Sequence, residues 1–155
     1  SCIAPFSGEM RYLLELYKLH GHRDLAHFFA FLLNRELESY RSDYCLVTVP
    51  CCPINAKKRG WDQMAVIAGL LKKDYGFSVA SLLKRRGQAQ QKELNRPGRE
   101  KNAGKAFFVP KAFSQEKIIL LDDIRTTGWS LASCSSVLKQ SGAREIVCFT
   151  LPRAQ

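Results

Sequence analysis

Apolar residues at helical spacing dominate the first forty positions. From Gly8 they recur every three or four residues until Gly21 interrupts the pattern, which predicts a short helix. Residues 25–40 predict a second helix, whose apolar positions occupy more than one face. Such a helix is either buried on two sides or part of a subunit contact, and we expect burial within the chain.

A unit of strand, loop, helix and strand follows. Residues 45–49 form an apolar, β-branched run that ends at Pro50, which predicts a buried parallel strand. After a polar, basic loop, residues 62–75 predict a helix and residues 78–83 a further strand. Residues 84–105 are polar and show no periodicity, which predicts a long, partly mobile connection.

A second unit of the same kind begins at residues 117–121, the strongest strand signal in the chain. A helix ending at Gly142 and a strand over residues 145–151 complete it. Right-handed crossovers would place the strand ends at Pro50 and Asp122 on one carboxyl edge of the sheet, where ligands bind. The pattern therefore predicts an α/β fold with a parallel sheet flanked by helices.

The composition is typical of one domain spanning residues 1–155. The chain is 46% apolar, which allows a real core at this length. Its longest apolar stretch, residues 25–33, is about half the roughly 20 residues that a membrane-spanning helix needs. We expect a protein of the cytoplasm with no membrane partner.

The basic residues are concentrated in the middle of the chain. Lys and Arg number 24 against 14 Asp and Glu, and the net charge is +10. Residues 57–111 carry the whole excess, because basic and acidic residues balance elsewhere. This segment predicts an anionic partner such as phosphate, pyrophosphate or nucleic acid. A basic surface that serves only solubility is the alternative.

The six cysteines form no C-x-x-C pair, and the three histidines lie far from most of them. This spacing indicates neither a zinc site nor a disulfide framework, so we expect free thiols. Cys45, Cys134 and Cys148 fall inside apolar runs and are expected in the core.

Residues 122–130 combine two acids with a loop rich in hydroxyls and a helix start. The loop amides and hydroxyls converge at a helix N-terminus, which favours a phosphate, and Gly128 allows close approach of the backbone. Asp122 and Asp123 would repel that phosphate, so they suit sugar hydroxyls or a hydrated Mg²⁺ ion. A merely capped helix is the alternative, but it leaves two acids after a buried strand without a purpose.

The same segment, Ile118-Ile-Leu-Leu-Asp-Asp-Ile-Arg-Thr-Thr-Gly-Trp-Ser130, resembles the phosphoribosyl pyrophosphate (PRPP) motif of type I phosphoribosyltransferases. Further motifs resemble the competence protein F (ComF) family in particular. They are Val49-Pro50, Pro53, Arg59-Gly-Trp-Asp-Gln63, Gln91, Leu94, Arg99, Asn102 and Ala106-Phe107. The resemblance extends from about Tyr17-Lys18 to Pro152.

This resemblance implies a role for each motif. Asp122 and Asp123 would be catalytic residues that approach the ribose hydroxyls. The resemblance also implies that residues 84–105 form a small hood or flap over the sugar. The other implied sites are the 5'-phosphate loop (Arg125, Thr126, Thr127, Gly128, Trp129, Ser130), the pyrophosphate loop (Pro50, Cys51, Cys52, Lys57, Lys58, Arg59) and anion-binding residues of the flap (Arg96, Arg99, Lys101, Lys105). Mg²⁺ would arrive with PRPP near the two acids, without ligands that come directly from the protein.

Some positions depart from the patterns of these families. Thr126 stands where some nucleobase transferases have a proton-accepting Asp, which disfavours purine salvage of that kind. Cys51 and Cys52 replace the common Leu and His, while Asp62 replaces Asn and Trp61 replaces Phe. Trp129 in the phosphate loop could shield the pocket or stack on a base, or could serve packing alone.

Two functions follow as hypotheses. The first is a phosphoribosyltransferase, a glycosyltransferase of the pentosyl class, or at least a binder of PRPP with Mg²⁺; its acceptor and its turnover are open. The alternative is a non-catalytic protein that binds single-stranded DNA through residues 57–111 or serves as a helicase adaptor. The resemblance links both to competence and DNA uptake, with a helicase-like translocase as partner. The family's zinc module is absent from this sequence, and the oligomeric state, a dimer included, stays open.

Overall fold

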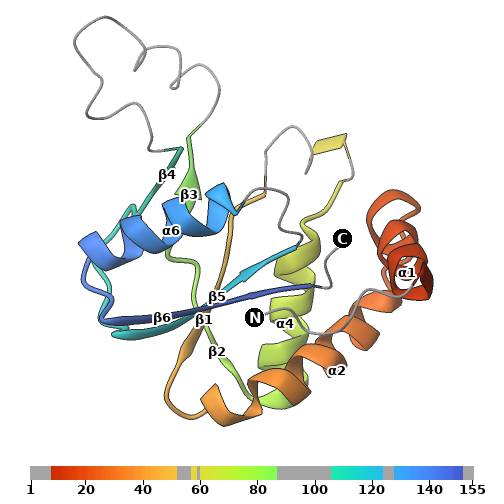
Figure 1. The fold of residues 1–155 in the computed structure, drawn as a ribbon, viewed down its shortest axis with the longest axis horizontal. Coiled ribbons are helices and arrows are strands. Elements are labelled where there is room, and N and C mark those ends of the chain that lie inside the picture. Colours follow the sequence, from red (N-terminus) through yellow and green to blue (C-terminus); the bar gives the residue numbers. More distant parts are fainter. Residues whose placement is uncertain (1–7, 52–56, 59, 87–105, 124–127, 152–155) are drawn as a thin grey trace, which may run out of the picture.

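The computed structural model describes residues 8–51, 57–58, 60–86, 106–123 and 128–151 (Figure 1). Its central sheet has four parallel strands in the order β2-β1-β5-β6. These strands are β1 (Cys45–Thr48), β2 (Ser78–Val79), β5 (Lys117–Asp122) and β6 (Glu145–Thr150). The parallel sheet with flanking helices confirms the predicted α/β class.

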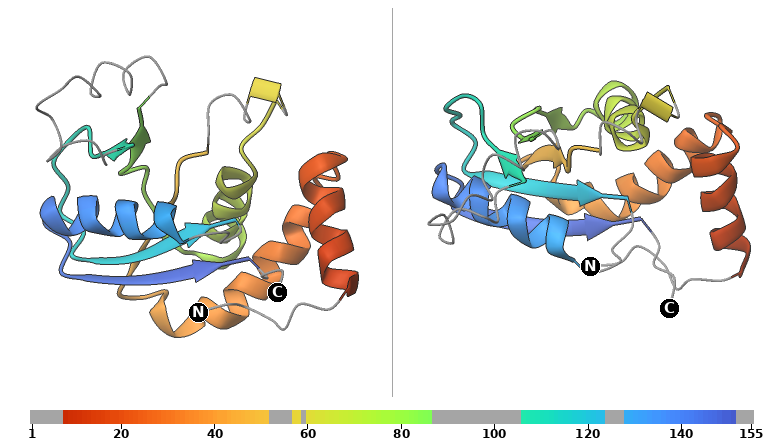
Figure 2. Two further views of the ribbon diagram at one scale, coloured as in Figure 1. Left: turned by 45° about the horizontal axis from the view of Figure 1, so that its top comes forward. Right: turned by 90° about the horizontal axis from the view of Figure 1, so that it is seen from above.

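Helices cover both faces of this sheet. They are α1 (Gly8–Leu19), α2 (Leu25–Leu37) with the 3₁₀ turn η1 (Glu38–Tyr40), α4 (Gln63–Tyr75) and α6 (Trp129–Gln140). Alternate strand residues point to opposite faces, so Ile119 and Leu121 pack with α1, α2 and α4, whereas Ile118 and Leu120 pack with α6. Figure 2 shows α4 and α6 on opposite sides of the sheet.

The α4 helix has a defined signal at each end. The Asp62 carboxylate accepts hydrogen bonds from the amides of Met64 and Ala65, which lack partners within the helix. Gly76 ends the helix with a φ of 74°, a left-handed conformation that a side chain disfavours. Both ends agree with the helix predicted over residues 62–75.

The strand predicted over residues 78–83 is shorter in the structure. Phe77 belongs to the core on the α4 side, whereas Leu83 belongs to the core on the α6 side, so the chain leaves the sheet between them. The next residues form β3 (Lys84–Arg85), which pairs antiparallel with β4 (Phe107–Phe108) in a separate two-stranded sheet. Residues 87–105, most of the predicted flap, lie outside the described residues.

The expectation that α2 is buried within the chain is met only in part. Five residues of α2 are buried, including Phe29 and Leu33, but Phe28 and Phe31 are 38% and 47% exposed. Its second apolar face is therefore not covered within the described part of the chain. No helix among the described residues is both long and apolar enough to cross a membrane.

The cysteines that the structure describes are free thiols, as predicted. Cys45 and Cys134 are buried, and Cys148 is half-buried against the core on the α6 side. Burial raises the pKa of the Cys134 thiol to about 12, and it also raises the pKa of Cys45. Cys45 and Cys134 therefore act as small core residues rather than as nucleophiles.

Candidate functional site

The carboxyl ends of three parallel strands meet at one edge of the sheet. Thr48 of β1 is in register with Leu121 of β5, and Asp122 is in register with Thr150 of β6. The Val49 amide continues the β1–β5 pairing by donating to the Leu121 carbonyl at 2.8 Å. The strand ends before Pro50 and at Asp122 therefore lie side by side, as the crossover rule predicted.

The two acids at the end of β5 lie in different environments. The Asp123 amide donates to Asp122 Oδ1 at 2.8 Å. Burial raises the pKa of Asp122 to about 6, and the neighbouring charge of Asp123 acts in the same direction. The amide hydrogen bond and the positive charges of Lys18 and Arg85 oppose this rise. Asp122 is thus the acid that the fold desolvates.

Asp123 is paired with a lysine from the beginning of the chain. Lys18, in the last turn of α1, places its Nζ 2.8 Å from Asp123 Oδ2. The Lys18 side chain is 15% exposed and that of Asp123 35%, so this pair is only partly accessible to water. Sequence reasoning did not assign Lys18 to the site; its one signal was that the family resemblance begins near Tyr17-Lys18.

Lys18 is held in place through its neighbour Tyr17, which is fully buried. The Tyr17 hydroxyl donates to the Gln63 carbonyl at 2.8 Å, and burial raises its pKa, so the hydroxyl keeps its proton. The Tyr17 ring meets the Trp61 ring edge-on, with centroids 5.0 Å apart. The Arg23 guanidinium lies 5.2 Å from the Trp61 ring centroid. The α1 helix therefore contacts residues 61–63, directly after the predicted pyrophosphate loop, as well as Asp123.

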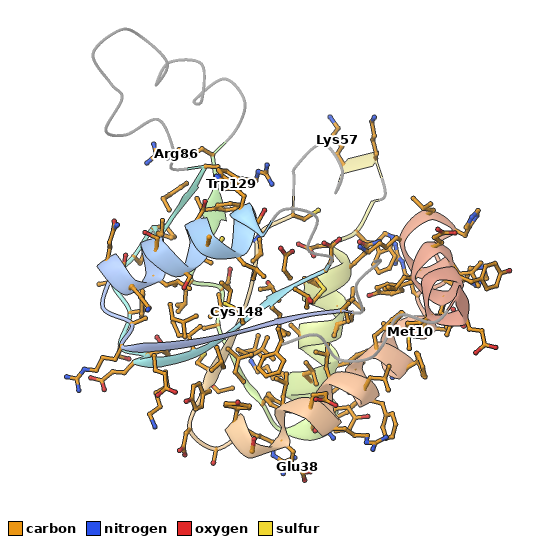
Figure 3. The ribbon with its side chains drawn as sticks, viewed as in Figure 1. Met10, Glu38, Lys57, Arg86, Trp129 and Cys148 are labelled. Carbon is orange, nitrogen blue, oxygen red and sulfur yellow. The ribbon has the colours of Figure 1, made fainter. Side chains whose placement is uncertain are left out.

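Arg85 and Trp129 both lie against the ring of Phe107, and the charge of Arg85 acts on Asp122. The Arg85 guanidinium lies 5.3 Å from the Phe107 ring centroid, and the Trp129 ring lies 6.0 Å from that of Phe107. Arg86 lies over Phe108 in the same way. Trp129 is 48% exposed, so packing accounts for only part of its surface. Figure 3 shows Arg86 and Trp129 at the same end of the molecule.

The structure places the remaining described site candidates as follows. Gly128 precedes α6 with a φ of 72°, and Ser130 lies half-buried in the first turn of that helix. Pro50 and Cys51 are half-buried after β1, while Lys57 and Lys58 are exposed. The other predicted site residues lie outside the described residues: Cys52, Arg59, Arg96, Arg99, Lys101, Lys105, Arg125, Thr126 and Thr127.

Asp122 and Asp123 are the carboxylates of this site that could face a Mg²⁺ ion. In the part of the chain that the structure describes, no group of three or more His, Cys, Asp or Glu side chains could hold a metal ion. Asp122 and Asp123 supply carboxylate oxygens at one place, which suits a Mg²⁺ ion completing its shell with substrate oxygens and water. The residues therefore fit Mg²⁺ that arrives with a phosphorylated ligand.

Solved structures similar to this chain are phosphoribosyltransferases. A hypoxanthine phosphoribosyltransferase from Staphylococcus aureus is 15% identical, with a TM-score of 0.43 over 84% of this chain and 64% of that one. A purine phosphoribosyltransferase from Pyrococcus horikoshii is 16% identical, with a TM-score of 0.42 over 83% of both chains. A hypoxanthine-guanine phosphoribosyltransferase from Bacillus anthracis is 12% identical, with a TM-score of 0.41 over 86% and 69%.

Sequence comparison identifies a nearer relative. No protein-family model matches the chain. Competence protein ComFC from Streptococcus pneumoniae is 30% identical over 151 residues, which are 97% of this chain. The chain spans 66% of the length of that relative. On this similarity, the chain belongs to the ComF family of competence proteins.

Proposed function

We propose that this edge of the sheet binds PRPP or a related phosphosugar together with Mg²⁺. The observation that carries the proposal is the pair Asp122 and Asp123 at the carboxyl end of β5, closely followed in the chain by the N-terminus of α6. A helix N-terminus attracts phosphate, and carboxylates accept hydrogen bonds from sugar hydroxyls. The two features together match the two halves of a sugar phosphate.

Different segments of the site bind different groups of this ligand. Asp122 and Asp123 bind the ribose hydroxyls, residues 125–130 hold the 5'-phosphate, and the loop from Pro50 to Arg59 meets the pyrophosphate. Bound Mg²⁺ supplies charge stabilisation for the pyrophosphate as it departs. Lys18 and Arg85 add positive charge beside the acids, which lowers the cost of bringing an anionic ligand to this edge.

Ligand-dependent thermal stability tests this proposal. A ligand that binds only the folded state stabilises it, by about 2.7 kcal/mol at a ligand concentration of 100 Kd. We expect PRPP with Mg²⁺ to raise the Tm of the wild-type protein, and not that of the double variant Asp122→Asn with Asp123→Asn. An equal rise for both proteins, or none for the wild type, would count against the site.

Turnover is a separate question, because a pocket does not by itself establish a reaction. We propose transfer of the phosphoribosyl group to a nitrogen nucleophile that attacks the anomeric carbon, with pyrophosphate as the leaving group. The acceptor can be sought by incubating the protein with PRPP, Mg²⁺ and pooled bases or amines. Pyrophosphate release that depends on one acceptor pool would identify its class, and no release from any pool would indicate a binding protein.

A second candidate function is direct binding of single-stranded DNA, in the cytoplasm and in support of competence. It is favoured by Arg85 and Arg86, which lie over the rings of Phe107 and Phe108, and by the half-exposed Trp129. Phe107 and Phe108 are buried and half-buried, so Trp129 is the ring on which a base could stack, while the two arginines supply positive charge for phosphates. The name of the relative, competence protein ComFC, agrees with this direction. A helicase-like translocase would be the partner of such a protein.

A further inference from the structure

We propose that Lys18 determines which ligands reach the acid pair: its ammonium group is the resident counter-ion of Asp123 and keeps free divalent cations out, while favouring a cation that arrives bound to a phosphosugar. This inference deepens the proposed function of the same site and rests on it for the phosphosugar. The part that concerns free cations stands on the Lys18–Asp123 contact alone.

The contact is close and only partly hydrated. Lys18 Nζ lies 2.8 Å from Asp123 Oδ2, which is the distance of a charge-assisted hydrogen bond. The ammonium group therefore occupies a place on the carboxylate where a divalent cation would otherwise bind. A cation that binds alone must displace it and leave an ammonium group that is 15% exposed without its partner.

The helix that carries Lys18 has little freedom to withdraw it. Tyr17 is fully buried, its hydroxyl is bonded to the Gln63 carbonyl, and its ring packs on Trp61 and Phe29. Leu14, one turn earlier, is also buried. Release of Asp123 therefore requires movement of the Lys18 side chain alone, not of α1.

An anionic ligand changes this balance. When a phosphosugar enters with its cation, the ammonium group released from Asp123 gains a new partner among the oxygens of the ligand. Without Lys18, two adjacent carboxylates would face that ligand with one compensating charge fewer, since Arg85 remains. Loss of Lys18 should thus strengthen the binding of a free cation and weaken the binding of a phosphosugar.

The experiment compares Lys18→Met with Lys117→Met. Lys117 also pairs with an aspartate, Asp43 at 3.9 Å, but it begins β5, about 17 Å from Asp122 at the usual rise of a strand. Both variants lose one positive charge and one ion pair. Free Mn²⁺ is the first probe, measured by its electron paramagnetic resonance signal in the absence of phosphosugar, and PRPP with Mg²⁺ is the second.

We expect Lys18→Met to bind Mn²⁺ roughly tenfold more tightly than the wild type and PRPP with Mg²⁺ roughly tenfold more weakly. Lys117→Met should change neither affinity. Asp123→Asn added to Lys18→Met should abolish the gain in Mn²⁺ binding. Opposite changes are informative because a misfolded site would lose both ligands.

Lys18→Arg keeps a positive charge at the same position and serves as the second variant. It should hold Mn²⁺ affinity near that of the wild type, and it remains informative if Lys18→Met does not fold. The inference would be overturned if Lys18→Met bound Mn²⁺ with the same affinity as the wild type. It would also be overturned if Lys18→Met bound Mn²⁺ more tightly and Lys18→Arg showed the same gain in affinity.

The two proposals can fail separately. If the wild type bound no PRPP but Lys18→Met alone bound Mn²⁺ more tightly, the proposed ligand would be refuted and the role of Lys18 as counter-ion would stand. If the wild type bound PRPP and Lys18→Met had the same affinities as the wild type for Mn²⁺ and for PRPP with Mg²⁺, the proposed function would stand and the role of Lys18 would be refuted.

Discussion

Asp122 and Asp123 are neighbours in the chain, yet they carry different chemistry. Asp122 is the desolvated acid, with a pKa raised to about 6 chiefly by burial, whereas Asp123 forms an ion pair with Lys18. The sequence identified both acids but could not distinguish them, because the difference comes from burial of Asp122 in the folded chain and from Lys18 of α1, which is distant in sequence. Such divergence between paired acids is typical of functional sites.

Asp122→Asn should stabilise the folded protein at neutral pH. The folded-state pKa of about 6 lies above the ordinary value of 3.8, so the folded protein binds this proton more tightly than the unfolded chain. The free energy of unfolding of the wild type therefore falls as pH rises from about 4 to 6, by about 3 kcal/mol at most. Asparagine removes this cost and can still accept the Asp123 amide.

Urea unfolding of both proteins at several pH values provides the measurement. The variant should be more stable than the wild type at pH 7.5, and the difference should shrink below about pH 5. Asp43→Asn, at a side chain that is 62% exposed, is the control and should show no such trend. A constant difference across this range would show that burial of Asp122 is not the cause.

Trp129 should report ligand binding by its fluorescence. The chain has two tryptophans, and Trp61 packs against Tyr17 whereas Trp129 is 48% exposed in the first turn of α6. Phosphate at that helix end would change the surroundings of Trp129 alone. We expect ribose 5-phosphate, which lacks the pyrophosphate that would approach Trp61, to change the emission of the wild type and of Trp61→Phe, and not that of Trp129→Phe. A response that follows Trp61 would contradict this placement.

At the scale of elements, contacts of α1 and α4 explain two departures from the family pattern. Trp61 stands where the family has Phe, and its ring packs against Tyr17, a contact that any aromatic side chain can make. Asp62 stands where the family has Asn, and its carboxylate caps α4, which asparagine also does well. Trp61 and Asp62 therefore connect α1 to the start of α4, directly after the predicted pyrophosphate loop.

Replacement of Asp62 tests this interpretation. Asp62→Ala removes the acceptor for the Met64 and Ala65 amides and should lower the free energy of unfolding by about 1 kcal/mol. Asp62→Asn should cost only a few tenths of that amount, roughly 0.3 kcal/mol. Urea denaturation of the two variants decides the matter, and an Asn variant as unstable as the Ala variant would refute a purely capping role.

The long elements could be predicted from the sequence, and the short ones could not. Apolar periodicity and the signals at Asp62, Gly76 and Gly142 located the helices and the strands at 45–48, 117–122 and 145–150 within a few residues. The pairing of β3 with β4 joins two-residue strands about twenty residues apart, and neither strand carries a local signal. Lys18 was missed for the same reason, since its partner Asp123 is 105 residues away.

For the whole molecule, the basic segment 57–111 predicts that DNA binding depends on salt. Each phosphate contact with a single strand contributes about −0.7 to the slope of log affinity against log salt. Replacing Lys57 and Lys58 by Gln should therefore make the slope shallower by about 1.4. Both are exposed, and Figure 3 shows Lys57 in the same half of the molecule as Arg86 and Trp129.

The matched control replaces Lys72 and Lys73, which are equally exposed but lie in the last turn of α4. This pair removes the same charge from the same segment and should leave the slope unchanged. The measurement is fluorescence anisotropy of a labelled oligonucleotide at salt concentrations from about 50 to 200 mM, a range over which phosphate-driven affinity falls steeply. A flat response of the wild type would argue against phosphate-driven binding.

The central claim is that Asp122 and Asp123 form one half of a phosphosugar site. Calorimetric titration of PRPP with Mg²⁺ into the wild type, the double variant Asp122→Asn with Asp123→Asn, and Asp43→Asn tests it most directly. We predict binding at one site per chain for the wild type and for Asp43→Asn, and its loss in the double variant. No heat from the wild type, or equal binding by the double variant, would contradict the account.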